Sequence, residues 1–362
     1  MSKARQLADL GNQIDDGAIT GSNMVVNGGM TVAQRGTSVT GLTGTAFLLD
    51  RFELTNSNHG TWTLSQDTDA PAGFSKSMKI LCTTIDSSVG SADYSFFLYK
   101  LEGNEVQQLA SGTASAKSLT LSFWVKSNVT GTFSATFRNE DNNRQCGGAY
   151  TVNSSGTWEY KTVTIPPDTV AGYTDDNTLA LQVEWWLGAG SAFTGGTLPT
   201  SWETSSNADR AGANTVDVGT VTNGYFQITG VCLNVGDSAI DFPHESYGDT
   251  LAKCQRYFQA FNADSGSNTI LSNGIAETTS QVRGAVPLLV QMRAVPSVSV
   301  SDITHFRFYT TGQHNFTGGA INGLSKKAMG IFAATSASMT AGHAGQVLWN
   351  SASGHVHADA EL

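Results

Sequence analysis

Short runs in which every second residue is apolar fill residues 24–242, and this alternation limits the possible folds more than any other feature. In residues 119–126, for example, Leu, Leu, Phe and Val alternate with Thr, Ser, Trp and Lys. Successive side chains of a strand point to opposite faces, so each run predicts a strand with one buried face. Clusters rich in Gly, Asn and Ser separate the runs and are typical of the turns between antiparallel strands. The chain is therefore predicted to be all-β.

The composition agrees with this prediction. Charged residues make up 14% of the 362 residues, against roughly 25% in ordinary soluble domains. The outward faces of the strands must then be covered mainly by Ser, Thr, Asn and Gln. Many short strands without helical periodicity between them predict a jelly-roll β-sandwich over residues 23–245. The strands at 119–125 and 133–138 are expected to form a hairpin through the turn at 129–131.

A short amphipathic helix is expected between this sandwich and the rest of the chain. Leu251, Cys254 and Phe258 lie on one helical stripe, which predicts a linking helix over residues 246–260. Further alternating runs after it predict a second, smaller β-domain over residues 261–362. Its last ten residues, SGHVHADAEL, are expected to be a polar turn or tail.

Residues 1–22 form a separate N-terminal segment. Leu7, Leu10 and Ile14 recur at spacings of three and four, which predicts one short amphipathic helix. An isolated helix of this length is marginal in water, so it needs a surface on which to dock. We interpret the segment as an arm that anchors the chain to a larger assembly, with a frayed terminus as the alternative.

Several classes of partner and cofactor are disfavoured. The formal net charge of -10 opposes the binding of nucleic acid, whose phosphates require Lys and Arg. No apolar run reaches the length of a signal peptide or the roughly 18 residues of a membrane span, which predicts synthesis in the cytosol and no membrane insertion. The four widely spaced Cys are expected to be reduced and buried. No cofactor is expected, although the oxygen-rich turns at 140–143 and 175–177 offer ligands suited to a structural calcium ion.

Two tryptophans are the leading candidates for ligand binding. Each lies on the face of its strand opposite the aliphatic residues, Trp124 together with Lys126, and Trp186 together with Gln182 and Glu184. The C–H face of a sugar ring is apolar and stacks on an exposed aromatic ring, while amides and carboxylates bind its hydroxyl groups. The pattern therefore predicts glycan contact. The alternative is that a neighbouring subunit or the N-terminal arm covers this face and buries both rings.

Other aromatic residues are weaker candidates. Trp62, Trp158 and Tyr160 stand singly in predicted strands, where aromatic side chains usually belong to the core. Trp202 lies in the Gly- and Ser-rich stretch 188–214, a long loop of the kind that often carries function.

Five segments resemble bacteriophage tail-fibre proteins. They are VVNGGMTVAQRGTSVT (25–40), LLDRFEL (48–54), SLTLSFWVKSNVTGTFSATF (118–137), WEYKTVTIP (158–166) and ITGVCLNVGDSAIDFPHESYGDTLAKCQRYF (228–258). The resemblance is to fibres of marine and cyanobacterial phages that carry a jelly-roll domain like that of carbohydrate-binding modules. It extends over residues 24–300.

This resemblance implies a homotrimeric virion protein on the tail or the capsid surface, assembled in the host cytoplasm and held to other virion proteins by the N-terminal arm. It also implies that the sandwich faces the host, so surface polysaccharide or lipopolysaccharide is the expected ligand. The chain differs from longer fibres in having no shaft and a short arm. A capsid decoration or head-fibre protein is therefore the first alternative.

Catalysis is not expected. A glycosidase needs two carboxyl groups flanking the bond that it cleaves, and here carboxylates are paired only as close sequence neighbours on expected turns, such as 140–141 and 175–176. The motifs GxSxG and HExxH are absent from the sequence. The protein is thus predicted to bind glycans without cleaving them, and a polysaccharide depolymerase is the second alternative.

Overall fold

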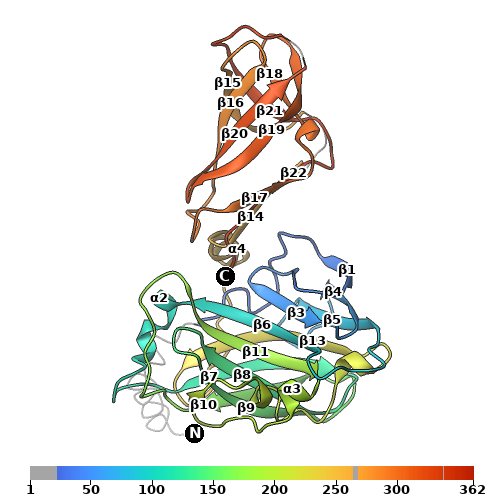
Figure 1. The fold of residues 1–362 in the computed structure, drawn as a ribbon, viewed down its shortest axis with the longest axis vertical. Coiled ribbons are helices and arrows are strands. Elements are labelled where there is room, and N and C mark those ends of the chain that lie inside the picture. The colour runs from blue at the N-terminus through green and yellow to red at the C-terminus, as the bar shows by residue number, and fades with distance from the viewer. Residues whose placement is uncertain (1–22, 264–267, 337) are drawn as a thin grey trace. The chain divides into compact units, whose positions relative to one another are not determined.

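The computed structural model describes residues 23–263, 268–336 and 338–362 (Figure 1). The chain divides into two compact units, one formed by residues up to Thr250 together with Leu362, the other by Leu251–Glu361. The division falls within residues 246–260, where the sequence predicts a linking helix. The predicted anchoring residues Leu7, Leu10 and Ile14 lie outside the described residues.

The first unit is a sandwich of two antiparallel sheets (Figure 1). The six-stranded sheet has, in order, β1 (Ser38–Leu42), β4 (Thr61–Asp67), β5 (Ser77–Thr84), β13 (Tyr225–Val235), β7 (Leu119–Ser127) and β10 (Glu159–Ile165). The seven-stranded sheet has β12 (Glu203–Thr204), β9 (Arg144–Val152), β8 (Gly131–Asn139), β11 (Leu179–Ala189), β6 (Tyr94–Glu102), β3 (Phe52–Ser57) and β2 (Ala46–Phe47). Short helical turns, α2 (Gly103–Val106) and η1 (Gln107–Leu109), follow β6. The predicted all-β jelly-roll class is confirmed.

The core lies between the two sheets and consists of the apolar residues that alternate along the strands. Phe123 of β7 meets Trp185 of β11 at 5.9 Å between ring centroids, and Phe226 of β13 meets Phe133 of β8 at the same separation. All four side chains are fully buried. Burial of each large apolar side chain contributes about 1.5–3 kcal/mol to the free energy of folding. The apolar residues at alternate positions of the strands therefore stabilise the sandwich.

The predicted hairpin between residues 119–125 and 133–138 is wrong. β7 and β8 belong to different sheets, and the chain crosses from one sheet to the other at the turn. Ser127 holds the crossing in place because its hydroxyl donates to the Tyr225 carbonyl and accepts from the Val129 amide, at 2.6 and 3.0 Å. Alternation indicates which face of a strand is buried, and it does not indicate which strand is the neighbour.

The outer face of the seven-stranded sheet is covered by the chain's own segment 190–217. This segment contains α3 (Ser191–Thr194) and η2 (Asn207–Asp209), and η3 (Val218–Thr220) follows it. The Thr136 hydroxyl of β8 donates to the Arg210 carbonyl at 2.6 Å, and the Asn214 side-chain carboxamide donates to the Trp186 carbonyl at 3.2 Å. Phe193 is buried against Trp186 beneath the segment. This sheet therefore has little free outer surface.

The second unit contains a closed barrel and a small sheet. The barrel has, in order, β15 (Ile270–Ala276), β16 (Gln281–Pro287), β20 (Ala328–Thr335), β19 (Gln313–Ser325), β18 (Phe306–Tyr309) and β21 (Ala344–Trp349). The three-stranded sheet has β14 (Phe258–Asn262), β22 (His355–Asp359) and β17 (Ser297–Val300). Two helical elements accompany them, α4 (Tyr247–Gln255), which spans the division between the units, and η4 (Ile303–His305).

Two predictions for this part of the chain are wrong. The last residues are not a turn or tail, because β22 is the central strand of the three-stranded sheet and buries Val356 and Ala358. Phe258 does not continue the helical stripe, because it begins β14. The first error arises because polar residues, His355, His357 and Asp359, occupy the outward positions of β22.

All four cysteines are free and buried, as the sequence predicts. Within the described residues, no helix is long and apolar enough to cross a membrane. In the same part of the chain, no group of three or more His, Cys, Asp or Glu side chains is placed to hold a metal ion. In the turns suggested for calcium, the Asp176 carboxylate instead accepts from the Thr178 amide at 2.8 Å, and that of Asp141 from the Thr174 amide at 2.9 Å.

Native protein is expected to be inert to the thiol reagent DTNB at pH 8. Burial raises the pKa of the Cys82 thiol to about 11, and those of Cys146 and Cys232 to about 12, and the thiolate is the reactive form. Unfolding in guanidinium should release four reactive thiols per chain, the full cysteine content. Rapid release of nitrothiobenzoate from the native protein would contradict the burial of these side chains.

Candidate functional site

An open hollow of about 590 Å³ lies on the outer face of the six-stranded sheet. Strands β7, β10 and β13 supply its floor, and the loops 68–76 and 236–246 supply its walls. The lining residues are Ala72, Gly73, Phe74, Ser122, Trp124, Tyr160, Gly230, Asp241, Phe242 and His244. Five of these ten residues carry aromatic rings, so the hollow offers several apolar ring faces to solvent.

Trp124 and Tyr160 lie next to each other on the floor. They are directly opposed across β7 and β10. Both point away from the core, because Phe123 and Val163, which lie one residue before the first and three residues after the second on the same strands, point into it. Their ring centroids are 5.4 Å apart with planes tilted by 52°. Tyr160 is 44% exposed. The pair therefore forms a firm platform that solvent reaches.

Gly230 brings the wall loop against this platform. Its φ of +62° places it in the left-handed region, where the pairing of β13 with β7 is irregular. A Cβ atom here would lie 2.7 Å from Cζ of Phe74 and 3.1 Å from Cδ1 of Trp124. Only glycine lets the Phe74 ring approach the strand and Trp124 so closely.

Replacement of Gly230 by Ala is expected to displace Phe74 and to deform the hollow. The left-handed backbone alone costs an alanine about 1–2 kcal/mol, and the clash with Phe74 adds to that cost. Gly156→Ala is a matched control, since Gly156 has a φ of +70° and its Cβ would meet nothing closer than 3.8 Å. Urea unfolding of both variants should show a larger loss for Gly230→Ala, and equal losses would contradict the close packing of Phe74.

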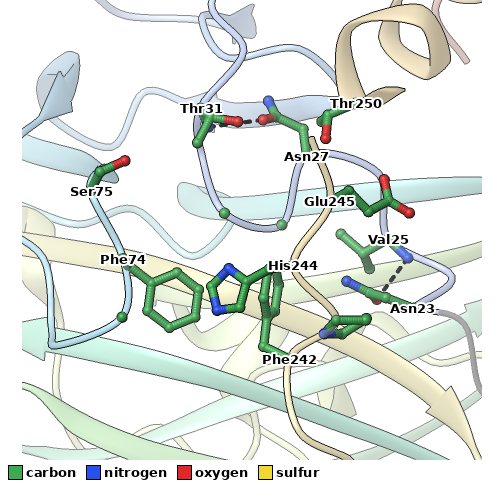
Figure 2. Close-up of a pocket in the computed structure, with 14 residues that line it drawn as sticks. Asn23, Val25, Asn27, Thr31, Phe74, Ser75, Phe242, His244, Glu245 and Thr250 are labelled. Atoms are coloured by element: carbon green, nitrogen blue, oxygen red, sulfur yellow. Dashed lines mark hydrogen bonds between the residues drawn. The ribbon is translucent and has the colours of Figure 1, made fainter. Parts of the chain in front are cut away.

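Three rings form a wall at one end of the hollow. The ring centroids of Phe74 and Phe242 are 5.0 Å apart, those of Phe74 and His244 are 5.2 Å apart, and those of Phe242 and His244 are 5.0 Å apart. Figure 2 shows the Phe74 and His244 rings facing each other from the two wall loops. The three rings fix one another, so this aromatic wall (Phe74, Phe242 and His244) is preorganised.

A second hollow, of about 100 Å³, shares the aromatic wall with the first, and Figure 2 shows the residues that line it. Its lining includes Asn23, Asn27, Thr31, Ser75, Glu245 and Thr250. Asn27 organises this region, because its carboxamide accepts from the amides of Thr31 and Val32 and donates to the Val32 and Asp50 carbonyls at 2.9–3.1 Å. The second hollow is therefore more polar than the first.

Lys126 is engaged in an ion pair beside the platform. Its ammonium lies 2.6 Å from Oδ2 of Asp69, and the Trp158 indole donates to Oδ1 of the same carboxylate at 3.1 Å. The hydrogen bond from Lys126 lowers the pKa of Asp69. The backbone carbonyl of Asp69 also accepts from Gln227 at 3.0 Å, which fastens the wall loop to β13. Lys126 thus holds the wall rather than pointing into the hollow as a free cation.

The predicted glycan contacts at Gln182, Glu184 and Trp186 are wrong. Trp124 and Trp186 lie on different sheets, and Glu184 and Trp186 are completely buried beneath the segment 190–217. The sequence-based alternative is burial by a neighbouring subunit or by the N-terminal arm. The segment that buries these side chains instead follows β11 directly in the chain.

A buried ion pair occupies that covered face. The guanidinium of Arg210 lies 2.5 Å from Oε1 of Glu184 and stacks 4.9 Å from the Trp186 ring centroid. The carboxylate also accepts from the Trp186 indole at 3.0 Å and from the Gln182 carboxamide at 2.6 Å. Each polar group there is satisfied within the chain, so this cluster (Gln182, Glu184, Trp186 and Arg210) is structural.

Trp202 also has a structural environment. It immediately precedes β12 at the edge of the seven-stranded sheet, packs against the core, and donates from its indole to the Pro166 carbonyl at 2.8 Å. It does not line either hollow. Of the leading candidates for glycan contact, Trp124 lines the larger hollow and Lys126 lies beside it, and of the weaker candidates Tyr160 lines the same hollow.

Ser95, His59 and Asp217 have the connectivity of a catalytic triad, but in an inaccessible place. The ring nitrogens of His59 hydrogen-bond Ser95 Oγ at 2.8 Å and Asp217 Oδ2 at 3.0 Å. His59 and Ser95 are completely buried, and Gly188 and Gly219 close over the imidazole so tightly that a Cβ on either would collide with it. A substrate cannot reach this serine, so the arrangement is a buried polar link between strands and loops.

Phe74, Phe242 and His244 are the site residues that the sequence does not reveal. They lie in the loops that follow β4 and β13, where no periodicity assigns a direction to a side chain. Tyr160 is visible only as a weak candidate, since a single aromatic residue in a strand is more often buried. Knowledge that β10 pairs with β7 would have made Tyr160 a stronger candidate for ligand binding, because this pairing places Tyr160 opposite Trp124.

Comparison with known proteins gives structural likeness only. No family model matches the sequence, and no curated protein matches it. Among solved structures, the enzymatically active domain of bacteriophage CBA120 tailspike protein 4 aligns with a TM-score of 0.31 and 13% identity over 59% of this chain and 21% of that chain. The match thus spans about a fifth of the length of the tailspike structure.

Carbohydrate-binding modules are also similar. The CBM22-1 xylan-binding domain of Paenibacillus barcinonensis Xyn10C aligns with a TM-score of 0.29 and 7% identity over 60% of this chain and 97% of that domain. The family 11 module of a Clostridium thermocellum cellulosomal cellulase aligns with a TM-score of 0.27 and 13% identity, over 56% of this chain and 96% of the module. At these TM-scores and identities the likeness says nothing about what this chain binds. A proposal about its ligand therefore has to rest on the geometry of the hollow.

Proposed function

We propose that this protein is a non-catalytic virion component of a bacteriophage that binds host-surface glycans through the hollow at Trp124. The observation that carries the proposal is an open hollow in which half of the lining residues have aromatic rings. Sugar rings present apolar C–H faces, so such a surface suits stacking of a pyranose on Trp124 or Tyr160. Asp241 and His244, which are both exposed, supply polar groups for its hydroxyls.

Binding without cleavage is supported by the carboxylates of the site. Hydrolysis by two carboxyl groups requires both to flank one glycosidic bond. Asp241 is the only carboxylate among the residues that line the larger hollow, where a sugar would stack on the platform. We therefore expect that host polysaccharide incubated with the protein releases no reducing ends.

The virion assignment rests on the resemblance of the sequence to phage tail fibres. In this proposal the chain is a homotrimer, residues 1–22 attach it to other virion proteins, and the sandwich faces the host polysaccharide or lipopolysaccharide. Electron cryomicroscopy of the intact virion tests this placement. Density for the chain at the distal end of the tail supports adsorption, whereas density on the capsid lattice would support a decoration protein instead.

Tyr160→Ala tests the site directly. Loss of half of the platform is expected to weaken binding to a glycan array about tenfold, since burial of part of an aromatic ring contributes about 1–2 kcal/mol. Tyr309→Ala is the matched control, because Tyr309 is also a strand residue with 44% exposure but belongs to the second unit. Equal binding by the two variants would show that the ligand does not contact the platform.

A further inference from the structure

The two hollows form the two ends of one surface. Both are lined by Gly73, Phe74, Phe242 and His244, so the aromatic wall is the boundary that they share. A ligand longer than one sugar that stacks on Trp124 would therefore pass along this wall toward the smaller hollow. There it would meet Ser75 and Thr31, whose hydroxyl groups suit hydrogen bonds to a sugar (Figure 2).

The charge along this surface has a single sign. Among the described residues that line the two hollows, Asp241 and Glu245 are acidic and exposed, and none is Lys or Arg. Lys126 lies on the same face of β7 as Trp124, but its ammonium is held by the Asp69 carboxylate at 2.6 Å. A sulfated, phosphorylated or uronic-acid sugar would find no Lys or Arg in the lining, and like charges at a recognition surface oppose binding.

We propose that the two hollows form one continuous groove for an uncharged or amine-bearing oligosaccharide, which spans the aromatic wall, and that the groove discriminates against polyanionic glycans. This inference rests on the proposed glycan-binding function and names the class of glycan. The platform of Trp124 and Tyr160 binds one sugar ring by stacking. The smaller hollow binds a further sugar unit through hydroxyl groups, and Asp241 and Glu245 set the preference for charge.

The preference for charge can be measured with hexasaccharides of defined charge. Cellohexaose and chitohexaose are neutral, the glucosamine hexamer is cationic, and the galacturonic acid hexamer is anionic. Isothermal titration at pH 7, together with an array that contains all three classes, is expected to give binders only among the neutral and amine-bearing glycans. Tightest binding by the anionic hexamer, or by anionic members of the array, would overturn the inference while leaving glycan binding intact.

Charge reversal provides the second readout. Asp241→Lys is expected to raise the affinity for the galacturonic acid hexamer and to lower that for the glucosamine hexamer, each by about two- to fivefold, as for exposed charge pairs. Asp237→Lys is the control, because Asp237 is an exposed acid of the same wall loop that lines neither hollow. Equal effects of the two substitutions would show that the charge of the whole surface, and not that of the groove, sets the preference.

Ligand length tests the continuity of the groove. Ser75 lines the smaller hollow and not the larger one, so Ser75→Tyr is expected to fill the smaller hollow. It is expected to weaken binding of chitohexaose or cellohexaose at least fivefold while leaving the corresponding disaccharides unchanged. Ser88→Tyr, at an exposed serine outside both linings, is the control. If Ser75→Tyr and Ser88→Tyr bind the hexasaccharides equally well, the continuous groove is wrong. If the wild-type protein binds no glycan on the array, the proposed function fails as a whole.

Discussion

Trp124→Ala is expected to weaken glycan binding about thirtyfold. The substitution removes the larger ring of the platform, and the loss of about 2 kcal/mol of apolar contact corresponds to that change in Kd. Trp124 lies outside the sandwich core, so the free energy of unfolding should change far less than it does for a core tryptophan. Titration of the variant with the tightest wild-type binder among the neutral and glucosamine hexasaccharides measures the first effect, and urea unfolding measures the second.

Trp202→Ala is the natural comparison for this variant. Trp202 is a partly buried tryptophan that lines neither hollow, so its removal should lower stability without changing affinity. Two results would contradict the assignment of Trp124 to the binding site. Unchanged affinity of Trp124→Ala would remove this ring from the site, and dissociation of an oligomer by Trp124→Ala would identify the ring as a subunit contact.

The largest loss of stability is expected for Arg210→Met. This change leaves the Glu184 carboxylate completely buried without its closest cation, at 2.5 Å in the wild-type protein. Removal of one partner from a buried ion pair costs about 3–5 kcal/mol. Arg138 lies 3.9 Å from the same carboxylate and offsets part of the loss, so about 3 kcal/mol is expected. Urea unfolding followed by tryptophan fluorescence reports on it, since every Trp except Trp349 belongs to the first unit.

A second substitution separates the charge effect from lost packing. Glu184→Gln combined with Arg210→Met removes both charges and keeps an oxygen that accepts a hydrogen bond from Trp186 or Gln182. The double variant is expected to recover more than half of the stability lost by Arg210→Met alone. If the effects of the two substitutions simply add, the guanidinium contributes mainly through its packing on the Trp186 ring, and the ion pair has little coupling energy. Glycan binding should persist in both variants under folding conditions.

The sequence predicts the class of the fold better than its connections. Alternation at residues 119–126 correctly separates Phe123, which enters the core, from Trp124, which does not. It assigns β7 and β8 to one hairpin although they belong to opposite sheets, because the turn that crosses the sandwich has the same residue types as a turn within a sheet. The strand β22 is missed because His and Asp occupy its outward positions.

The candidate site is predictable only where it lies on strands. The strand period alone places Trp124 opposite the aliphatic face, and Trp124 does line the larger hollow. Trp186 shows the same pattern, yet it is buried by the segment 190–217, and no local pattern reveals which surface a long loop will cover. The wall rings Phe74 and Phe242 are set by long-range contacts such as the approach of Phe74 to Gly230, which requires knowledge of the sheet pairing.

The division of the hollow into a floor of strands and walls of loops bears on how its specificity can evolve. The floor residues share strands with the core, so most changes there risk the stability of the sandwich. The loops 68–76 and 236–246 bring Phe74, Asp241, Phe242 and His244 to the ligand, and none of these residues belongs to the core between the sheets. Loops tolerate substitution better than the elements that they connect. Under selection by a changing host, sequence variation should therefore collect in these two loops while the sandwich stays the same.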